Sequence, residues 1–233
     1  MNIKILQLLE GAKQATGLTV VIDVFRAYSL EAYLLSMGAE KIIPVGKEEI
    51  AYKLKEENLD MILAGERGGK IMPGFDIGNS PAQAKSLDVA GKTVIHTTSA
   101  GTQGIANAVN ADEIIGGSLV TAKAIAEYIR RSGKTDISLV CMGLAAKEPT
   151  EEDTLCARYI KALLEGTADE IDFEKEIEIL KNTSGVKFFD KSKSDVFPEE
   201  DFHMCVEVDK FNFVPKLVKS PDGLDYITKV IID

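Results

Sequence analysis

The chain has 233 residues, 45% of them hydrophobic, and it contains no apolar run of the length that a membrane-spanning helix needs. Its formal net charge of −10 opposes binding to polyanions, although a small anion could bind where local cations or a metal ion overcome that field. The three cysteines, Cys141, Cys156 and Cys205, are odd in number and widely spaced, which argues against a disulfide framework and fits a reducing cytoplasm. We therefore expect a soluble cytoplasmic protein without nucleic-acid or membrane partners.

The first 145 residues alternate short β-branched runs with helical patterns. The strand-like runs are 18–22, 41–45, 60–64, 92–96, 112–116 and 136–142. The helical patterns between them are 29–39, 47–58, 80–87 and 121–133. This alternation predicts an α/β fold with a mostly parallel or mixed sheet and helices on both faces.

The pattern changes after Gly143. Residues 151–164 and 169–182 predict two amphipathic helices, a polar stretch covers 188–201, and residues 203–212 alternate as a strand would. We predict two closely packed α/β lobes, 1–143 and 144–233, with the site between them.

Polar residues and glycines follow several of the predicted strands. Because ligands of open parallel sheets bind beyond the carboxyl ends of the strands, these loops are the first candidates for a site. They are 23–26, 65–70, 97–102 and the loop from Gly143 to 151–153.

Two of these loops allow a structural as well as a functional interpretation. Asp23 is either a turn or capping residue or part of a site, and Arg26 is either its ion-pair partner or a ligand for an anion. In the segment 65–81, Ser80 and Pro81 fit a helix start, but the length of this glycine-rich, charged connection favours a functional loop.

The loop 96–104 and the segment after Thr150 are likewise ambiguous. Hydroxyl groups and free backbone N–H groups at 97–102 could hold an anion, whereas His96 continues an apolar strand and is expected to be buried and structural. Thr150 and Asp153 fit a helix-capping pattern, but Glu152 or Asp153 could also join other carboxylates around Mg²⁺.

Two familiar phosphatase mechanisms do not fit these residues. An Asp nucleophile with an acid two positions later fails because that position is Phe25, and a cysteine phosphatase fails because no arginine closely follows Cys141. Attack by water with the help of a metal ion is the simplest hydrolytic mechanism that remains.

The segments VVIDVFRA, GERGGKIMPGFDIGNSP, TTSAGT and EEDTLCA together resemble the 2-phosphosulfolactate phosphatases of coenzyme M biosynthesis. The motifs span about Val20 to Ala157, and the second is the most specific. The resemblance implies a two-lobed α/β enzyme that uses Mg²⁺ to hydrolyse a small anionic phosphate ester, most simply 2-phosphosulfolactate to sulfolactate and phosphate. A homodimer is compatible with it.

The resemblance also implies roles for individual positions. The expected catalytic residues are Asp23, Arg26, Glu66 and Arg67. The expected substrate-binding residues are Gly74, Asn79, Ser80, Thr97, Thr98, Gly101 and Thr102. The expected metal ligands are drawn from Asp23, Asp76, Glu152 and Asp153.

The chain also departs from the family pattern. Tyr28-Ser29-Leu30 replaces a common pair of hydroxyl residues, and Ser99-Ala100-Gly101-Thr102 stands where the family commonly has Asn-Gly-Thr. These changes leave two alternatives open: a protein that binds a phosphorylated or sulfonated hydroxyacid without turnover, and an isomerase or lyase that acts on a phosphorylated acid.

Overall fold

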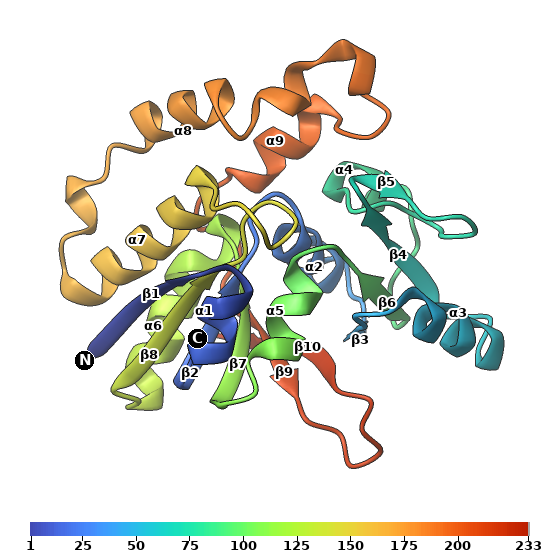
Figure 1. The fold of residues 1–233 in the computed structure, drawn as a ribbon, viewed down its shortest axis with the longest axis horizontal. Coiled ribbons are helices and arrows are strands. Elements are labelled where there is room, and N and C mark those ends of the chain that lie inside the picture. The colour runs from blue at the N-terminus through green and yellow to red at the C-terminus, as the bar shows by residue number, and fades with distance from the viewer. Residues whose placement is uncertain (233) are drawn as a thin grey trace.

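The computed structural model describes residues 1–232 and contains one ten-stranded mixed sheet with helices on both faces (Figure 1). The strands are β1 (Asn2–Gln7), β2 (Gly17–Ile22), β3 (Lys41–Pro44), β4 (Ile62–Arg67), β5 (Lys70–Ile71), β6 (Thr93–Thr97), β7 (Ala111–Gly117), β8 (Asp136–Cys141), β9 (Phe213–Val218) and β10 (Tyr226–Ile231). The predicted fold class is confirmed.

Apart from the adjacent strands β4 and β5, the helices alternate with the strands up to β8, and α7, α8 and α9 then follow one another without a strand between them. They are α1 (Leu8–Gln14), α2 (Ala27–Ser36), α3 (Glu48–Glu57), α4 (Pro81–Ala84), α5 (Gly101–Asn107), α6 (Ala122–Ser132), α7 (Glu151–Glu165), α8 (Phe173–Asn182) and α9 (Glu199–Cys205). Short 3₁₀ turns cover Leu119–Thr121, Ala168–Glu170, Val186–Phe189 and Lys191–Lys193. No helix within residues 1–232 is long and apolar enough to cross a membrane.

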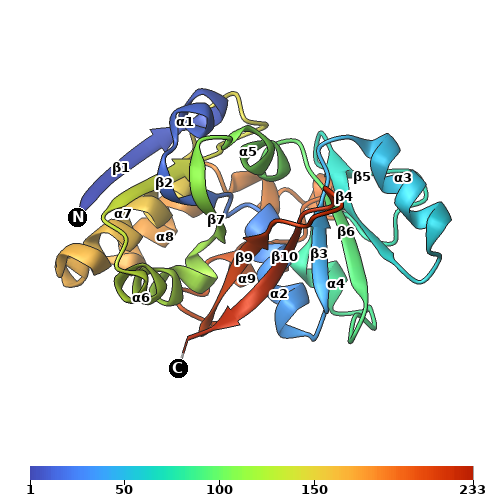
Figure 2. The same ribbon diagram turned by 90° about the horizontal axis from the view of Figure 1, so that it is seen from below.

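The sheet consists of two parallel groups joined by an antiparallel hairpin. Its order is β1-β8-β2-β7-β9-β10-β3-β6-β4-β5. β1, β8, β2 and β7 are mutually parallel, as are β3, β6 and β4, whereas β9 and β10 pair antiparallel with each other and with their outer neighbours. Figure 2 shows β9 and β10 between the two groups. The two groups therefore run in opposite directions through the sheet.

Three apolar clusters hold the helices on the sheet. Val21 and Ile42 belong to a core that continues into α1, α2 and α4, whereas Val20 and Ile22 pack with residues of α6 and α7. A smaller cluster joins Ile95 of β6 to α3. The strand β2 is almost continuously apolar because both of its faces are covered.

The C-terminal part differs from the sequence prediction in one misplaced strand and in three unpredicted elements, α9, β9 and β10. Residues 203–212 do not form the predicted strand: α9 continues to Cys205, and β9 begins only at Phe213. Phe202 and Cys205 are buried at helical spacing, so an apolar face of α9 produced the apparent alternation. The strand order does not by itself divide the chain into domains, and the boundary between residues 143 and 144 stays a prediction.

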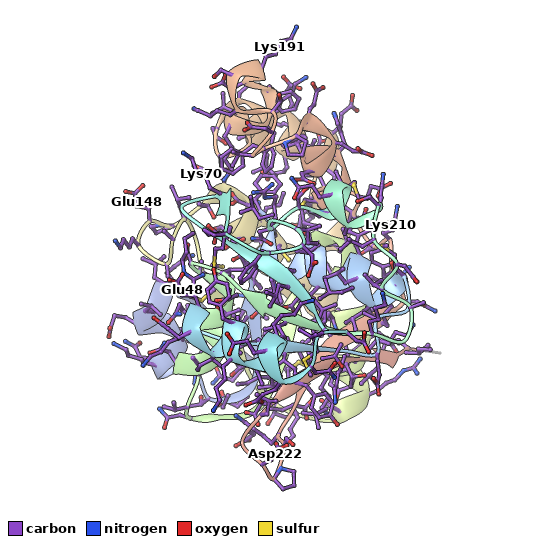
Figure 3. All side chains as sticks on the ribbon, turned by 90° about the vertical axis from the view of Figure 1, so that its right-hand side faces the viewer. Glu48, Lys70, Glu148, Lys191, Lys210 and Asp222 are labelled. Carbon is purple, nitrogen blue, oxygen red and sulfur yellow. The ribbon has the colours of Figure 1, made fainter. Side chains whose placement is uncertain are left out.

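The two ends of the molecule are marked by the side chains of Figure 3. Lys191 lies at the outer end of the segment between α8 and α9, and Asp222 lies at the opposite end, in the β9–β10 turn. The first of these segments, 183–198, reaches back to the pocket described next.

Candidate active site

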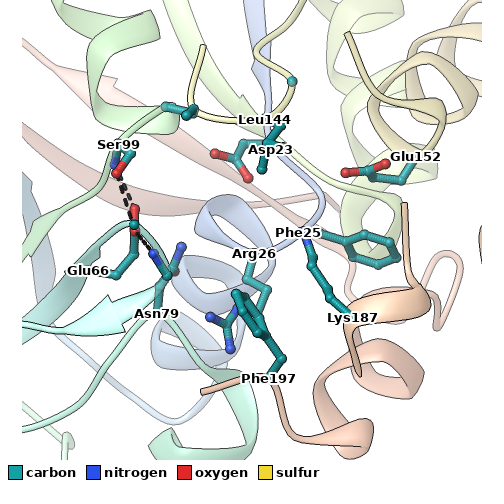
Figure 4. Close-up of a pocket in the computed structure, with 15 residues that line it drawn as sticks. Asp23, Phe25, Arg26, Glu66, Asn79, Ser99, Leu144, Glu152, Lys187 and Phe197 are labelled. Atoms are coloured by element: carbon teal, nitrogen blue, oxygen red, sulfur yellow. Dashed lines mark hydrogen bonds between the residues drawn. The ribbon is translucent and has the colours of Figure 1, made fainter. Parts of the chain in front are cut away.

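A pocket of about 230 Å³ lies where the loops after β2, β4, β6 and β8 meet the segment between α8 and α9 (Figure 4). The carboxyl ends of both parallel groups thus border one cavity although the groups run in opposite directions. The lining residues are Asp23, Phe25, Arg26, Glu66, Gly68, Gly69, Asn79, Ser99, Ala100, Gly143, Leu144, Ala145, Glu152, Lys187 and Phe197.

Asp23 follows β2 directly and faces this cavity. Its Oδ1 accepts a hydrogen bond from the Ala27 N–H at 3.2 Å, which fixes the carboxylate at the start of α2. Burial raises the pKa of Asp23 to about 6, with smaller contributions in the same direction from Glu66 and Glu152. A Cβ atom on Gly101 would lie 3.1 Å from Asp23 Oδ2, so a glycine is needed beside this carboxylate.

Glu152 and Asp153 begin α7 and have different surroundings. Figure 4 shows the Glu152 carboxylate pointing toward Asp23, and its buried Oε2 has no hydrogen-bond partner within residues 1–232. The oxygens of Asp153 instead accept the Val24 and Gly143 N–H groups, each at 2.8 Å. Burial raises the pKa of both carboxyls. Glu152 is therefore free for a ligand, whereas Asp153 fastens the loops after β2 and β8.

Glu66, at the end of β4, holds two pocket loops together. Its Oε1 accepts the Ser99 N–H at 2.7 Å and its Oε2 accepts the Gly69 N–H at 2.6 Å. Arg67, the next residue, is absent from the lining of this pocket. Its guanidinium donates to Thr97 Oγ1 at 2.8 Å and to the Glu66 carbonyl at 2.8 Å, so it ties β4 to β6.

The Arg26 guanidinium is buried in the wall of the pocket. Its Nη1 donates to Asp201 Oδ2 at 2.6 Å and to the Val196 carbonyl at 2.8 Å, and the Phe197 ring lies 4.9 Å from Cζ. Asp201 Oδ1 also accepts Ser80 Oγ at 2.9 Å. No partner for Arg26 Nε or Nη2 is found in the described part of the chain, so this edge can serve a ligand.

The segment 65–81 contains the short β4–β5 hairpin and then α4, and only part of it reaches the pocket. Asn79 lines the pocket, and its buried Oδ1 is unpaired among the described residues. Ser80 caps α4 by accepting the Gln83 N–H at 3.2 Å, as the structural interpretation predicted. Gly74 supplies a positive φ of 73° but is not a lining residue.

Asp76 lies outside the pocket. Its Oδ2 accepts the Leu63 N–H at 2.8 Å and stands 3.6 Å from Lys55 Nζ. Of the four carboxylates predicted as metal ligands, Asp23 and Glu152 line the same cavity. Asp153 is buried outside the lining and bonded to the backbone, and Asp76 also lies outside the lining.

The loop 97–102 contributes Ser99 and Ala100, and none of its threonines, to the lining of the pocket. Ser99 and Ala100 line the cavity, whereas Thr98 and Thr102 are buried and hydrogen-bonded to each other's backbone. Gly101 accepts the Tyr28 hydroxyl at its carbonyl oxygen, at 2.9 Å. The threonines shape this loop from behind.

The family departure at residues 28–30 lies behind the pocket as well. Tyr28 is buried against the loop 97–102, and Ser29 Oγ lies 2.5 Å from Ser118 Oγ. His96 is buried, as expected, and its Nδ1 lies 2.8 Å from Glu31 Oε1. Tyr28 and Ser29 do not line the cavity. Ala100, which belongs to the second departure from the family pattern, does line it.

Three functional candidates were missed by the sequence interpretation: Lys187, Phe197 and Asp201. All three come from residues 183–201. The sequence of this segment indicates a polar connection, because charged residues separate its aromatic residues. The pair Phe188-Phe189 and Phe197 were the available signal, since exposed loops rarely carry several aromatic side chains.

Few donor groups in the pocket could hold a metal ion. Within residues 1–232 no three Asp, Glu, His or Cys side chains are grouped closely enough to form a metal site by themselves. Asp23 and the unpaired oxygens of Glu152 and Asn79 nevertheless supply oxygen donors to one cavity. Such a set fits Mg²⁺, which takes one or two carboxylates and keeps several waters.

Comparison with known proteins places the chain in a family. A family model described as 2-phosphosulpholactate phosphatase matches residues 3–220. Proteins named probable 2-phosphosulfolactate phosphatase are similar to the chain: that of Caldanaerobacter subterraneus is 36% identical over 85% of this chain and 86% of its own length. Those of Bacillus subtilis and Thermotoga petrophila are 31% and 35% identical, over 92% and 85% of this chain and 92% and 88% of their own lengths. The chain therefore belongs to the 2-phosphosulpholactate phosphatase family.

Proposed function

We propose that this protein is a Mg²⁺-dependent phosphatase that hydrolyses 2-phosphosulfolactate to sulfolactate and phosphate. The observation that carries the proposal is the convergence of Asp23, Glu152 and Arg26 on one pocket in a chain of this family. At about 230 Å³ the pocket is smaller than the roughly 300–1,000 Å³ of sites for drug-sized ligands, which suits a small acid.

Asp23, Glu152 and Asn79 would hold the magnesium ion, because all three line the cavity and Glu152 and Asn79 each carry a buried oxygen without a hydrogen-bond partner among residues 1–232. When bound, the ion supplies positive charge for the phosphoryl oxygens. The free edge of Arg26 donates to the same group, and its orientation is fixed beforehand by Asp201 and Phe197. These charges overcome the repulsion that a chain of net charge −10 exerts on an anionic substrate.

The hydrolysis adds one water molecule across the phosphate ester. The water oxygen bonds to phosphorus, the bond from phosphorus to the alcohol oxygen breaks, and the alcohol leaves with a proton. Asp23 is placed to orient the water, since its carboxylate lies on the cavity wall with one oxygen already bonded to the Ala27 N–H. Glu66 would keep the loops of Gly69 and Ser99 in place beside the substrate, because its carboxylate accepts a backbone N–H from each.

The test is the release of phosphate from 2-phosphosulfolactate by purified protein, with and without magnesium. Asp23→Asn is the matched variant, and other phosphorylated hydroxyacids test the choice of substrate. If no ester in the panel is hydrolysed, the phosphatase proposal is wrong. Calorimetry that finds tight binding without turnover would favour the binding-protein alternative, and product analysis would reveal an isomerase or lyase.

The setting of this activity also remains a proposal. We expect the enzyme to act in the cytoplasm on a free small molecule and not on nucleic acid. A homodimer is compatible with the sequence, and size-exclusion chromatography with light scattering would measure the oligomeric state.

A further inference from the structure

Lys187 is a cation in the pocket that the sequence motifs do not include. It lies in the 3₁₀ turn Val186–Phe189, and Figure 4 shows its side chain entering the cavity near Phe25 and Arg26. Its Nζ lies 5.9 Å from the ring centroid of Phe25, 5.5 Å from that of Phe188 and 5.6 Å from that of Phe197. No hydrogen bond or ion pair of this ammonium is found within residues 1–232.

The ammonium group of Lys187 has aromatic rings within cation–π distance but no hydrogen-bond acceptor among residues 1–232. It carries three N–H donors, and polar groups removed from water are normally hydrogen-bonded because an unmade bond is costly. Burial lowers the pKa of Lys187 and Arg26 acts in the same direction, while Glu152, Asp23 and Asp153 favour the charged form. The carboxylates thus favour the charged amine without forming an ion pair with it, so that its N–H donors stay unpaired in the lining of the pocket.

The location of the amine identifies the group that it would bind. Arg26 is committed through one nitrogen to Asp201, so its other edge and Lys187 are the unpaired cationic donors among the lining residues. If Asp23 and Glu152 hold a divalent ion, Lys187 has no carboxylate partner of its own, and the edge of Arg26 that does not face Asp201 still carries unpaired donors. An anion with several oxygens that contacts the ion and both cations satisfies all of these groups, and in a phosphatase that anion is the reacting phosphoryl group.

We propose that Lys187 is a further substrate-binding residue, which donates hydrogen bonds to the phosphoryl oxygens beside Arg26. The identity of the anion rests on the proposed phosphatase function. The segment between α8 and α9 thus contributes Lys187, which binds the phosphoryl group directly, and the first turn of α9 contributes Asp201, which orients Arg26.

Lys187→Met tests this role because methionine has a similar length and suits aromatic surroundings. We expect the variant to melt at or above the wild-type temperature, since a half-buried ammonium no longer has to be accommodated. Its affinity for inorganic phosphate in the presence of magnesium, measured by calorimetry, should fall by about 10- to 100-fold, as for lost hydrogen bonds to a charged group. Lys191→Met is the matched control, because Lys191 belongs to the same segment and is exposed.

Two further measurements separate the alternatives. Titration with methanesulfonate should give the same affinity for both proteins; a loss for the sulfonate but not for phosphate would overturn the assignment to the phosphoryl group. In the wild-type protein, phosphate should protect Lys187, but not Lys191, from acetylation as measured by mass spectrometry. Unchanged phosphate affinity, or absent protection, would overturn the proposal. Both readouts use inorganic phosphate, so they decide the role of Lys187 even if 2-phosphosulfolactate is not hydrolysed.

Discussion

Replacing Asp201 with alanine should destabilise the protein and disable Arg26 together. Asp201 is fully buried and accepts Arg26 Nη1 at 2.6 Å, Ser80 Oγ at 2.9 Å and the Ala82 N–H at 2.8 Å. Removing one partner of a buried ion pair costs about 3–5 kcal/mol, because the other charge stays buried without compensation. Since a domain of this size changes its melting temperature by about 2–4 °C per kcal/mol, we expect a decrease of about 6–20 °C.

Urea unfolding and differential scanning calorimetry measure this effect. Glu200→Gln is the matched control, because Glu200 also belongs to α9 but forms an exposed ion pair, with Lys85. Loss of this exposed pair should cost less than about 1 kcal/mol. Asp201→Asn keeps a hydrogen-bond acceptor but loses the charge, so it should be more stable than the alanine variant and still bind phosphate poorly. The reasoning is refuted if Asp201→Ala loses no more stability than the control.

A double-mutant cycle with Arg26→Met tests whether the pair itself causes the loss. If Asp201 acts mainly by compensating Arg26, the double variant should be clearly more stable than the sum of the two single losses predicts. Strict additivity would instead assign the effect of Asp201 to its bonds with Ser80 and Ala82.

The remaining predictions concern the carboxylates and their packing. Saturating magnesium, at about 100 times its Kd, should stabilise the wild type by about 2.7 kcal/mol in a thermal-shift assay. Asp23→Asn and Glu152→Gln should abolish this stabilisation by magnesium. If Asp76→Asn abolished it as well, the assignment of the metal donors would be contradicted. Without magnesium, the raised pKa of Asp23 means that its protonated form favours folding, and this contribution, of about 3 kcal/mol, is lost as the pH rises from 3.8 through about 6. Asp23→Asn should therefore gain stability over the wild type across that window in urea titrations, and a constant difference would refute the shift. Gly101→Ala would place a Cβ 2.7 Å from Ala27 Cβ and 3.1 Å from Asp23 Oδ2, so we expect a loss of about 1–3 kcal/mol and of phosphate release, whereas normal activity would show that the Asp23 position is not critical.

The local sequence pattern determined the strands β2, β3, β4, β6, β7 and β8, most of the helices beside them, and several of the pocket residues. The run Leu18–Ile22 is apolar because both faces of β2 are covered, and it delivers Asp23 to the cavity as predicted. Glu66, Asn79 and Glu152 also reach the cavity from the ends of predicted elements. Each of these positions depends on a strand or helix boundary nearby in the chain, which spacing and residue type reveal.

Only the tertiary structure decided which polar residues line the pocket and which hold the strands and loops together. Arg67 and Asp76 carry charges at motif positions, but their hydrogen bonds with Thr97 and Leu63 turn them into parts of the β4 framework. The partner of Arg26 is Asp201, 175 residues away in the chain, and no local pattern encodes such a pairing. The hairpin of β9 and β10 likewise sets the two parallel groups in opposite directions, so the convergence of their carboxyl ends on one cavity depends on long-range packing and not on periodicity.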